Sequence, residues 1–114
     1  MTKLESNSLY YSDYLKLDKI LNSQNPKSSL KTDELLFIVI HQTYELWFKQ
    51  VIHEIDRVRE IFASEKVNDN AGEMSIAVHK LKRVVKIFEV LVQQVSILET
   101  MTSMDFLEFR YLLQ

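Results

Sequence analysis

The fold is decided by residues 32–64, TDELLFIVIHQTYELWFKQVIHEIDRVREIFAS, which carry neither Gly nor Pro. Thr32 is a suitable N-cap, and Asp33 and Glu34 suit the positive end of a helix dipole. The first half is apolar nearly all round, whereas the second half is amphipathic. We therefore predict a helix over about 33–64, roughly 45–50 Å long at 1.5 Å per residue, with its first half enclosed.

The rest of the chain also favours helix. One Gly and one Pro in 114 residues cannot supply the turns that a sheet protein needs. We predict an all-α helical bundle with a second long helix over about 73–101, after the break SEKVNDNAGE. A short helix is expected at 12–23 and a helix restart near 103, where Thr102 and Asp105 form a weak capping box. Residues 1–31 would be an arm and linker, and residues 32–114 the helical body.

Helical spacing also predicts which faces form the core. In the first long helix the stripe consists of Val51, Ile55, Val58 and Phe62. In the second it consists of Val78, Leu81, Val85, Phe88, Val92, Val95 and Met101. The stretches HEIDRVRE and HKLKRVVK, together with His53 and His79, are interpreted as solvated faces without a functional role.

Composition excludes several classes of protein. The formal charge of −2 gives no basic field for nucleic acid. The chain has no Cys, which removes disulfides and zinc–sulfur sites. No apolar run approaches the roughly 18 residues that a membrane helix requires. We expect a cytoplasmic protein that binds neither nucleic acid nor membrane.

A metal site built by this chain alone is not expected. No Glu stands three residues before a His, as the carboxylate-bridged sites of helical bundles require, and no His-x-x-x-His pair occurs. His41 and Glu45 share a helix face, but two ligands do not make a site.

Two aromatic-plus-polar pairs are the candidate binding residues. Phe37 and His41 are four residues apart and share a helix face, as do Phe106 and Arg110. His41 is either a hydrogen-bonded core histidine or one wall of a pocket for a flat ligand. Arg110 is either a surface residue with its stem over Phe106 or a carboxylate-binding residue. If the two pairs face each other, they suit an aromatic amino acid with a ring N–H.

Tyrosines gather near the N-terminus, at positions 10, 11 and 14. Such residues often serve amphipathic packing. Three within five residues also suit an arm that docks on a partner or covers a site.

Three long segments resemble the tryptophan 2,3-dioxygenase family. They are DELLFIVIHQTYELWFKQ, LVQQVSILETMTSMDFLEFR and the N-terminal YYSDYLKLDKIL. The resemblance spans about residues 10–113 in the family's order. It implies an all-helical, homotetrameric enzyme with haem b that inserts both atoms of O₂ across the indole C2–C3 bond of L-tryptophan. The product is N-formyl-L-kynurenine, in tryptophan catabolism.

The resemblance also implies roles for the candidate residues. Phe37 would pack on the indole, His41 would hydrogen-bond the indole N–H, and Arg110 would bind the substrate carboxylate. Phe106 would line the pocket. Tyr11 and Tyr14 would complete the site of a neighbouring subunit. His41 is expected to orient the substrate rather than to act as an obligatory base, because the oxidative chemistry belongs to the iron.

The departure from the family lies in length. The helical pattern of FLEFRYLLQ is still running at the last residue, so we expect a longer parent protein. The family's Pro-Ala-Ser-Gly loop and its iron-ligating histidine would follow, and this segment alone is expected to be inactive. Two alternatives stay open: a non-catalytic helical module that binds partners or tryptophan, and a related haem-dependent oxygenase acting on another indole or phenol.

Overall fold

The computed structural model describes residues 10–64 and 71–113, and every regular element in those ranges is a helix. The predicted all-α class is confirmed. The helices are α2 (Tyr11–Leu15), α3 (Leu17–Ile20), α4 (Glu34–Ala63), α5 (Ala71–Leu98) and α6 (Ser103–Arg110).

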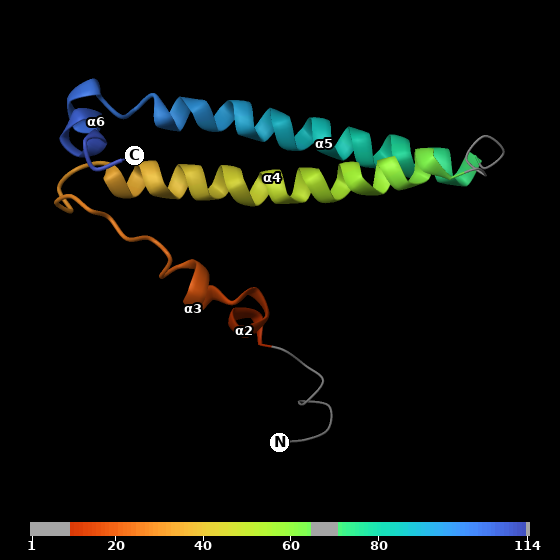
Figure 1. Cartoon of the computed structure of the whole chain (residues 1–114), viewed down its shortest axis with the longest axis horizontal. Coiled ribbons are helices and arrows are strands. Elements are labelled where there is room, and N and C mark those ends of the chain that lie inside the picture. The colour runs from red at the N-terminus through yellow and green to blue at the C-terminus, as the bar shows by residue number, and fades with distance from the viewer. Residues whose placement is uncertain (1–9, 65–70, 114) are drawn as a thin grey trace, which may run out of the picture.

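The helices α4 and α5 lie side by side and antiparallel and form the body of the molecule (Figure 1). After α5 the chain turns, and α6 packs across the beginning of α4. The arm formed by α2 and α3 extends away from this pair (Figure 1). This arrangement brings the first turns of α4, the end of α5 and the whole of α6 together at one end of the body.

A buried carboxylate, rather than Thr32 alone, organises the start of α4. Glu34 is 2% exposed, and its Oε1 accepts hydrogen bonds from the backbone N–H groups of Lys27 and Ser28 and from the Ser28 hydroxyl, at 2.7–2.8 Å. These bonds hold the pKa of Glu34 below its ordinary value, and the bond from the Lys27 N–H has the largest effect. The predicted N-cap is off by one residue, because Asp33 occupies that position without a side-chain capping bond, whereas the Thr32 hydroxyl accepts from the Glu34 N–H at 3.3 Å.

The core lies between α4 and α5 and only partly follows the predicted stripes. It has two clusters, of which one contains Val51, Val84, Ile87 and Leu91, and the other Val58, Ile61 and Ala77. In α4 the prediction was right for Val51 and Val58, whereas Ile55 and Phe62 are 37% and 53% exposed.

The predicted core face of α5 was wrong. Val85 and Val92 are 57% and 71% exposed, while the buried face begins at Ala77 and continues through Val84. The helix α5 carries apolar residues on two faces, so spacing alone could not select the one that packs. Small Ala77, 1% exposed, lies on the face that packs against α4.

The charged stretches are not simply solvated faces. Glu54 is 1% exposed, and its two oxygens accept hydrogen bonds from Lys80 Nζ and Arg83 Nη1, each at 2.8 Å. These two bonds lower the pKa of Glu54 to about 2, and the bond from Lys80 has the larger effect. The ion triad joins α4 to α5 across the helix pair.

Helix boundaries differ from prediction by a few residues. The second long helix ends at Leu98 rather than near Met101. The Thr102 cap is confirmed, because its Oγ1 accepts from the Asp105 N–H at 3.1 Å. The N-terminal helix is divided in two at Lys16, whose φ of 55° lies in the left-handed region and interrupts the helix.

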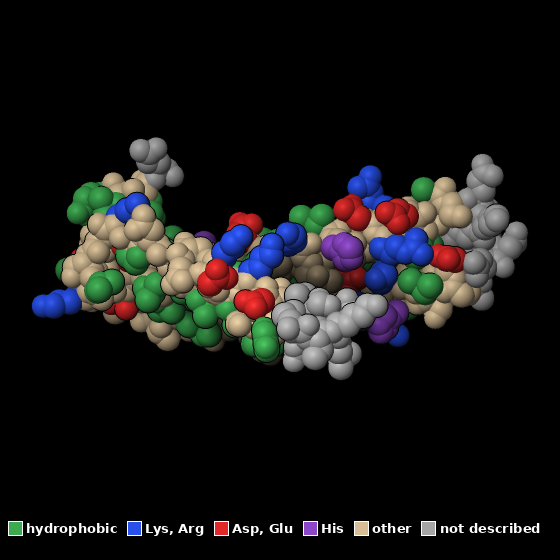
Figure 2. All heavy atoms as spheres, turned by 90° about the horizontal axis from the view of Figure 1, so that it is seen from below, with side chains coloured by type: hydrophobic (Ala, Val, Ile, Leu, Met, Phe, Trp, Pro, Cys, Tyr) green, Lys and Arg blue, Asp and Glu red, His purple; other side chains and the backbone are tan. Residues whose placement is uncertain are grey.

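The surface carries interspersed charges. On the face seen in Figure 2, basic and acidic side chains are interspersed, and hydrophobic side chains are most abundant toward the α6 end. None of the helices in the described ranges combines the length and the apolar character needed to cross a membrane.

Candidate functional site

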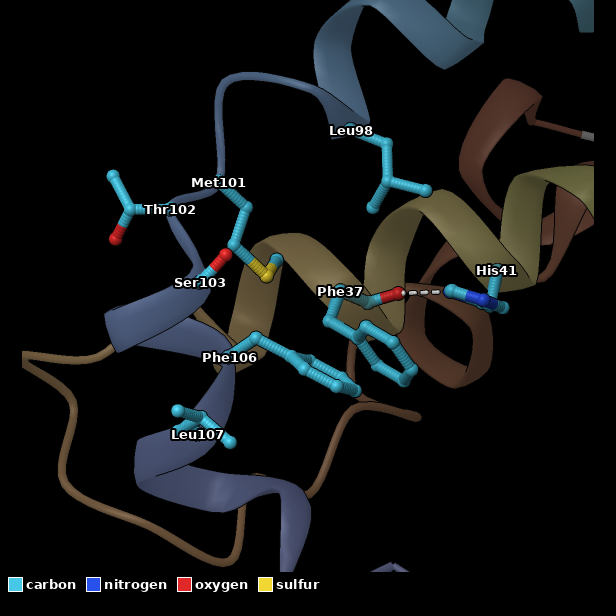
Figure 3. Close-up of a pocket in the computed structure, with 8 residues that line it drawn as sticks. All are labelled: Phe37, His41, Leu98, Met101, Thr102, Ser103, Phe106 and Leu107. Carbon is cyan, nitrogen blue, oxygen red and sulfur yellow. Dashed lines mark hydrogen bonds between the residues drawn. The ribbon is translucent and has the colours of Figure 1, made fainter.

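A cavity of about 540 Å³ lies where α4, α6 and the end of α5 meet (Figure 3). Phe37 and His41 line it from α4, Phe106 and Leu107 line it from α6, and Leu98 and Met101 line it from the end of α5 and the turn that follows. The structure therefore brings together three of the four residues predicted to bind substrate directly.

Three phenylalanines pack together beside this cavity: Phe37 and Phe106 line it, and Phe109 is buried behind them. The rings of Phe37 and Phe106 are 5.8 Å apart between centroids, and the ring of Phe109 lies 5.4 Å from Phe37 and 5.5 Å from Phe106. Aromatic pairs at such distances contribute about 0.5–1.5 kcal/mol each beyond the area they bury. The cluster holds α6 against α4 and leaves an apolar surface suited to a flat ring.

The imidazole of His41 has a defined proton arrangement. His41 Nδ1 lies 2.7 Å from the carbonyl oxygen of Phe37. A carbonyl only accepts, so Nδ1 must carry the hydrogen, and in the neutral ring Nε2 is then an acceptor. The side chain is exposed on the cavity. It therefore offers one hydrogen-bond acceptor beside the aromatic wall.

Arg110 lies one turn after Phe106 on α6, but it is not among the residues that line the cavity. It is exposed, and no ion pair in the described ranges involves it. Its guanidinium is thus available to an anionic ligand group at the edge of α6. The spacing placed Arg110 on the correct helix, but its predicted contact with substrate remains a prediction.

Tyr11 and Tyr14 lie on α2, far along the chain from this cavity. They are 74% and 67% exposed, and α2 contains no buried residue. The structure therefore does not bring them to the cavity of their own chain.

Two carboxyl groups meet where α4 and α6 begin. The pKa of Asp33 is raised above its ordinary value. The largest cause is a side-chain hydrogen bond with Asp105, followed by burial and by the charge of Asp105. Asp33 precedes Phe37 by one turn, and Asp105 directly precedes Phe106. This pair of carboxyl groups lies where the two helices that form the cavity begin.

Comparison with known proteins identifies the family. The family model described as tryptophan 2,3-dioxygenase matches residues 1–114. The tryptophan 2,3-dioxygenase of Dictyostelium discoideum is 51% identical over 109 residues, covering 92% of this chain and 27% of the relative. The rat enzyme of that name is 48% identical over 114 residues, covering 96% of this chain and 28% of the relative.

The chain belongs to the tryptophan 2,3-dioxygenase family. A bacterial relative of the same name, from Bdellovibrio bacteriovorus, is 49% identical over 109 residues. The match covers 92% of this chain and 30% of that relative. The chain therefore spans less than a third of the length of these curated relatives.

The tryptophan 2,3-dioxygenase family implies a haem cofactor, which the described residues fit in part. The cavity wall is apolar, as a flat macrocycle requires, and His41 is the one histidine among its lining residues. In the described ranges, no group of three or more His, Asp or Glu side chains could hold a metal ion.

Sequence reasoning missed some of the residues that shape this cavity. Phe109 is fully buried and contacts Phe37, and its spacing of three from Phe106 could have revealed it. Met101 was predicted to join the core stripe of the second helix, but it follows α5 and lines the cavity instead. The sequence predicted a helix restart near 103, but no signal gave the direction in which the chain turns between Leu98 and Ser103.

Proposed function

We propose that this chain forms the substrate-binding face of a tryptophan 2,3-dioxygenase. The whole enzyme would convert L-tryptophan and O₂ to N-formyl-L-kynurenine, and this chain would be its N-terminal part. The observation that carries the proposal is the convergence of Phe37, His41 and Phe106 on one apolar cavity, with the His41 Nε2 left as an acceptor.

The indole ring has a natural place in this arrangement. One face of the indole would pack on the apolar surface that the rings of Phe37 and Phe106 form together, with their centroids 5.8 Å apart. Its N–H would donate to Nε2 of His41. Because Nδ1 is already bonded to the Phe37 carbonyl, the imidazole holds its orientation before the ligand arrives. His41 thus orients the substrate and selects a ring that carries N–H.

The amino-acid part of the substrate would extend toward α6. Arg110 carries a positive charge that has no acidic partner in the described ranges, and its planar fork matches a carboxylate. Binding of the substrate carboxylate would draw the guanidinium toward the cavity mouth. Arg110 and His41 would then fix the two ends of tryptophan.

Tyr11 and Tyr14 are assigned to the site of a neighbouring subunit. Their exposure and their distance from the body support a role outside their own chain. The assembly implied by the family resemblance is a homotetramer. In it each arm would reach the cavity of another copy and complete the enclosure of tryptophan.

Haem b, bound to the iron-ligating histidine of a segment outside these 114 residues, would supply the activation of O₂ when it is present. The residues of this chain would bind the amino acid, orient its indole and exclude water from the cavity. No proton transfer by His41 is required for these tasks.

A chimera tests the proposal. The matched segment of the Dictyostelium relative is replaced by this chain, and the formation of N-formyl-L-kynurenine from L-tryptophan is followed. Turnover within about tenfold of the intact relative supports the assignment, because a tenfold change corresponds to only about 1.4 kcal/mol of binding. A chimera that folds and shows a Soret band but makes no product contradicts it.

One observation favours a second candidate function. The outer face of α5 exposes Val85, Phe88 and Val92, which a stable isolated helix pair would cover. A non-catalytic module that binds partners or tryptophan through this face would account for it. An inactive chimera, together with binding of L-tryptophan by the chain itself, would favour this alternative.

A further inference from the structure

Among the described residues, the arm formed by α2 and α3 is joined to α4 by hydrogen bonds at a single side chain of that helix. The helices α2 and α3 contact each other, and neither packs on α4, α5 or α6. Within the described ranges, the hydrogen bonds that join residues 10–24 to α4 all end on Gln42. Gln42 follows His41 directly in the sequence. The arm is therefore attached next to the candidate substrate-binding histidine.

The carboxamide of Gln42 uses both of its ends. Its Oε1 accepts from Nε2 of Gln24 at 2.8 Å, and its Nε2 lies within hydrogen-bond distance of the Ser23 carbonyl and hydroxyl oxygens, at 3.4 and 3.3 Å. An amide is the side-chain group that can accept and donate in this way. Neither a carboxylate nor an aliphatic side chain of similar size could make the same set of bonds.

The residues on the arm side are themselves held in place. The Ser23 hydroxyl donates to the carbonyl oxygen of Ile20 at 2.7 Å, and Gln24 Nε2 also donates to that oxygen at 2.9 Å. Ile20 is the last residue of α3. The orientation of α3 is therefore transmitted to Gln42 through two short links, without a flexible segment between them.

This attachment lies beside the cavity. A second hollow of about 370 Å³ is lined by Ile20 and Ser23 on the arm side and by His41, Gln42 and Leu46 on α4. His41 lines both hollows, so the base of the arm and the candidate substrate site share one side chain. A displacement of the arm base would open the space on that side of the imidazole.

We propose that Gln42 is a positioning residue that holds the base of the arm against α4 beside His41 and thereby sets the direction in which Tyr11 and Tyr14 are presented. The consequence for catalysis rests on the proposed function, because it requires that these tyrosines serve a neighbouring substrate site. The attachment itself does not depend on that function.

The attachment is tested by distance measurement between spin labels. The chain has no Cys, so Asp13→Cys on α2 and Lys49→Cys on α4 give two unique labelling sites. We expect one narrow distance distribution in the parent chain and a broad one after Gln42→Leu. Gln50→Leu, on the same helix, is the matched control and should leave the distribution narrow.

Two further variants separate loss of the attachment from general damage to the fold. Gln24→Ala should broaden the distribution as Gln42→Leu does, and the double variant should add little, because both changes break the same contact. Gln42→Glu keeps an acceptor for Gln24 and should broaden it less. Unchanged distributions in Gln42→Leu and Gln24→Ala would overturn the proposal.

The consequence for binding is measured in the active chimera. Gln42→Leu should raise KM for L-tryptophan about 3- to 10-fold, the effect of losing one neutral hydrogen-bonded contact, with a smaller change in kcat. A broadened distance distribution with unchanged KM would overturn the link from the arm to the site. An inactive parent chimera would instead contradict the proposed function, and the distance result would stand separately.

Discussion

His41 is joined to Phe37 twice: their ring centroids are 4.1 Å apart, and His41 Nδ1 donates to the Phe37 carbonyl oxygen at 2.7 Å. One turn of α4 thus fixes both the apolar surface and the proton arrangement of the imidazole beside it. The free Nε2 is an acceptor, which is the group that an indole N–H requires. The spacing of four residues is therefore the basis of ligand recognition in this account.

Replacement of His41 should remove the preference for a ring N–H. In the active chimera, His41→Leu should lower kcat/KM for L-tryptophan about 3- to 10-fold, since one neutral hydrogen bond is lost. The analogue in which sulfur replaces the indole nitrogen should lose little. Rates are compared for the two substrates in both proteins. An equal loss for both substrates would argue against a hydrogen bond to the ring nitrogen.

Arg110 should determine recognition of the carboxylate. Arg110→Leu should lower kcat/KM for L-tryptophan about 10- to 100-fold, because a charge-assisted contact is lost. Tryptamine, which lacks the carboxylate, should be affected much less. Arg110→Lys should restore only part of the rate, because an ammonium group lacks the planar fork. If Arg110→Leu leaves the ratio of the two substrates unchanged, Arg110 does not bind the carboxylate.

Phe109 should anchor α6 to the body. It is fully buried and contacts both Phe37 and Phe106, so Phe109→Ala should destabilise the attachment of α6 by about 3–5 kcal/mol. Amide hydrogen exchange should increase throughout α6, while the middle of α4 stays protected. Met104→Ala on the same helix is the control, because Met104 is 72% exposed. Unchanged protection of α6 in Phe109→Ala would contradict the assigned role.

Glu54 should make stability depend on pH in acid. Its pKa is lowered from 4.5 to about 2 in the folded chain, so it stabilises the fold above pH 4.5 and loses that contribution as the pH falls toward 2. The free energy of unfolding of the parent chain should decline over this window. Glu54→Gln should show a shallower decline there.

The same carboxylate should matter at neutral pH. Glu54→Ala should reduce the free energy of unfolding by about 2–3 kcal/mol. This is below the full cost of breaking a buried pair, because the Arg83 side chain is half exposed and that of Lys80 partly exposed. Denaturant unfolding at pH 7 measures this. A loss no larger than that of Glu60→Ala, at an exposed ion pair, would show that the triad adds no net stability.

The sequence predicted those features that depend on local pattern. The span of α4, the Thr102 cap and the shared face of Phe37 and His41 follow from residues close together in the chain. The buried face of α5 could not be predicted, because apolar residues occupy two of its faces and the choice depends on α4. The contact of Phe37 with Phe109 depends on the direction in which the chain turns before α6, and the pattern predicted the helix restart but not that direction.

Hydrogen-bond and ion-pair partners on different segments could not be predicted from the sequence either. Glu54 reads as one of several charges on an amphipathic helix, and only the position of α5 pairs it with Lys80 and Arg83. The bonds from Gln42 to Ser23 and Gln24 likewise cross from the body to the arm. Spacing along a helix identifies shared faces, but it does not identify the segment that packs there.

The most direct test of the central claim is an experimental structure of the active chimera with bound L-tryptophan. The account predicts that the indole nitrogen lies about 2.7–3.2 Å from Nε2 of His41, with the ring against Phe37 and Phe106 and the carboxylate on Arg110. Tryptophan bound elsewhere, or bound in this cavity with Nε2 of His41 facing solvent, would contradict it.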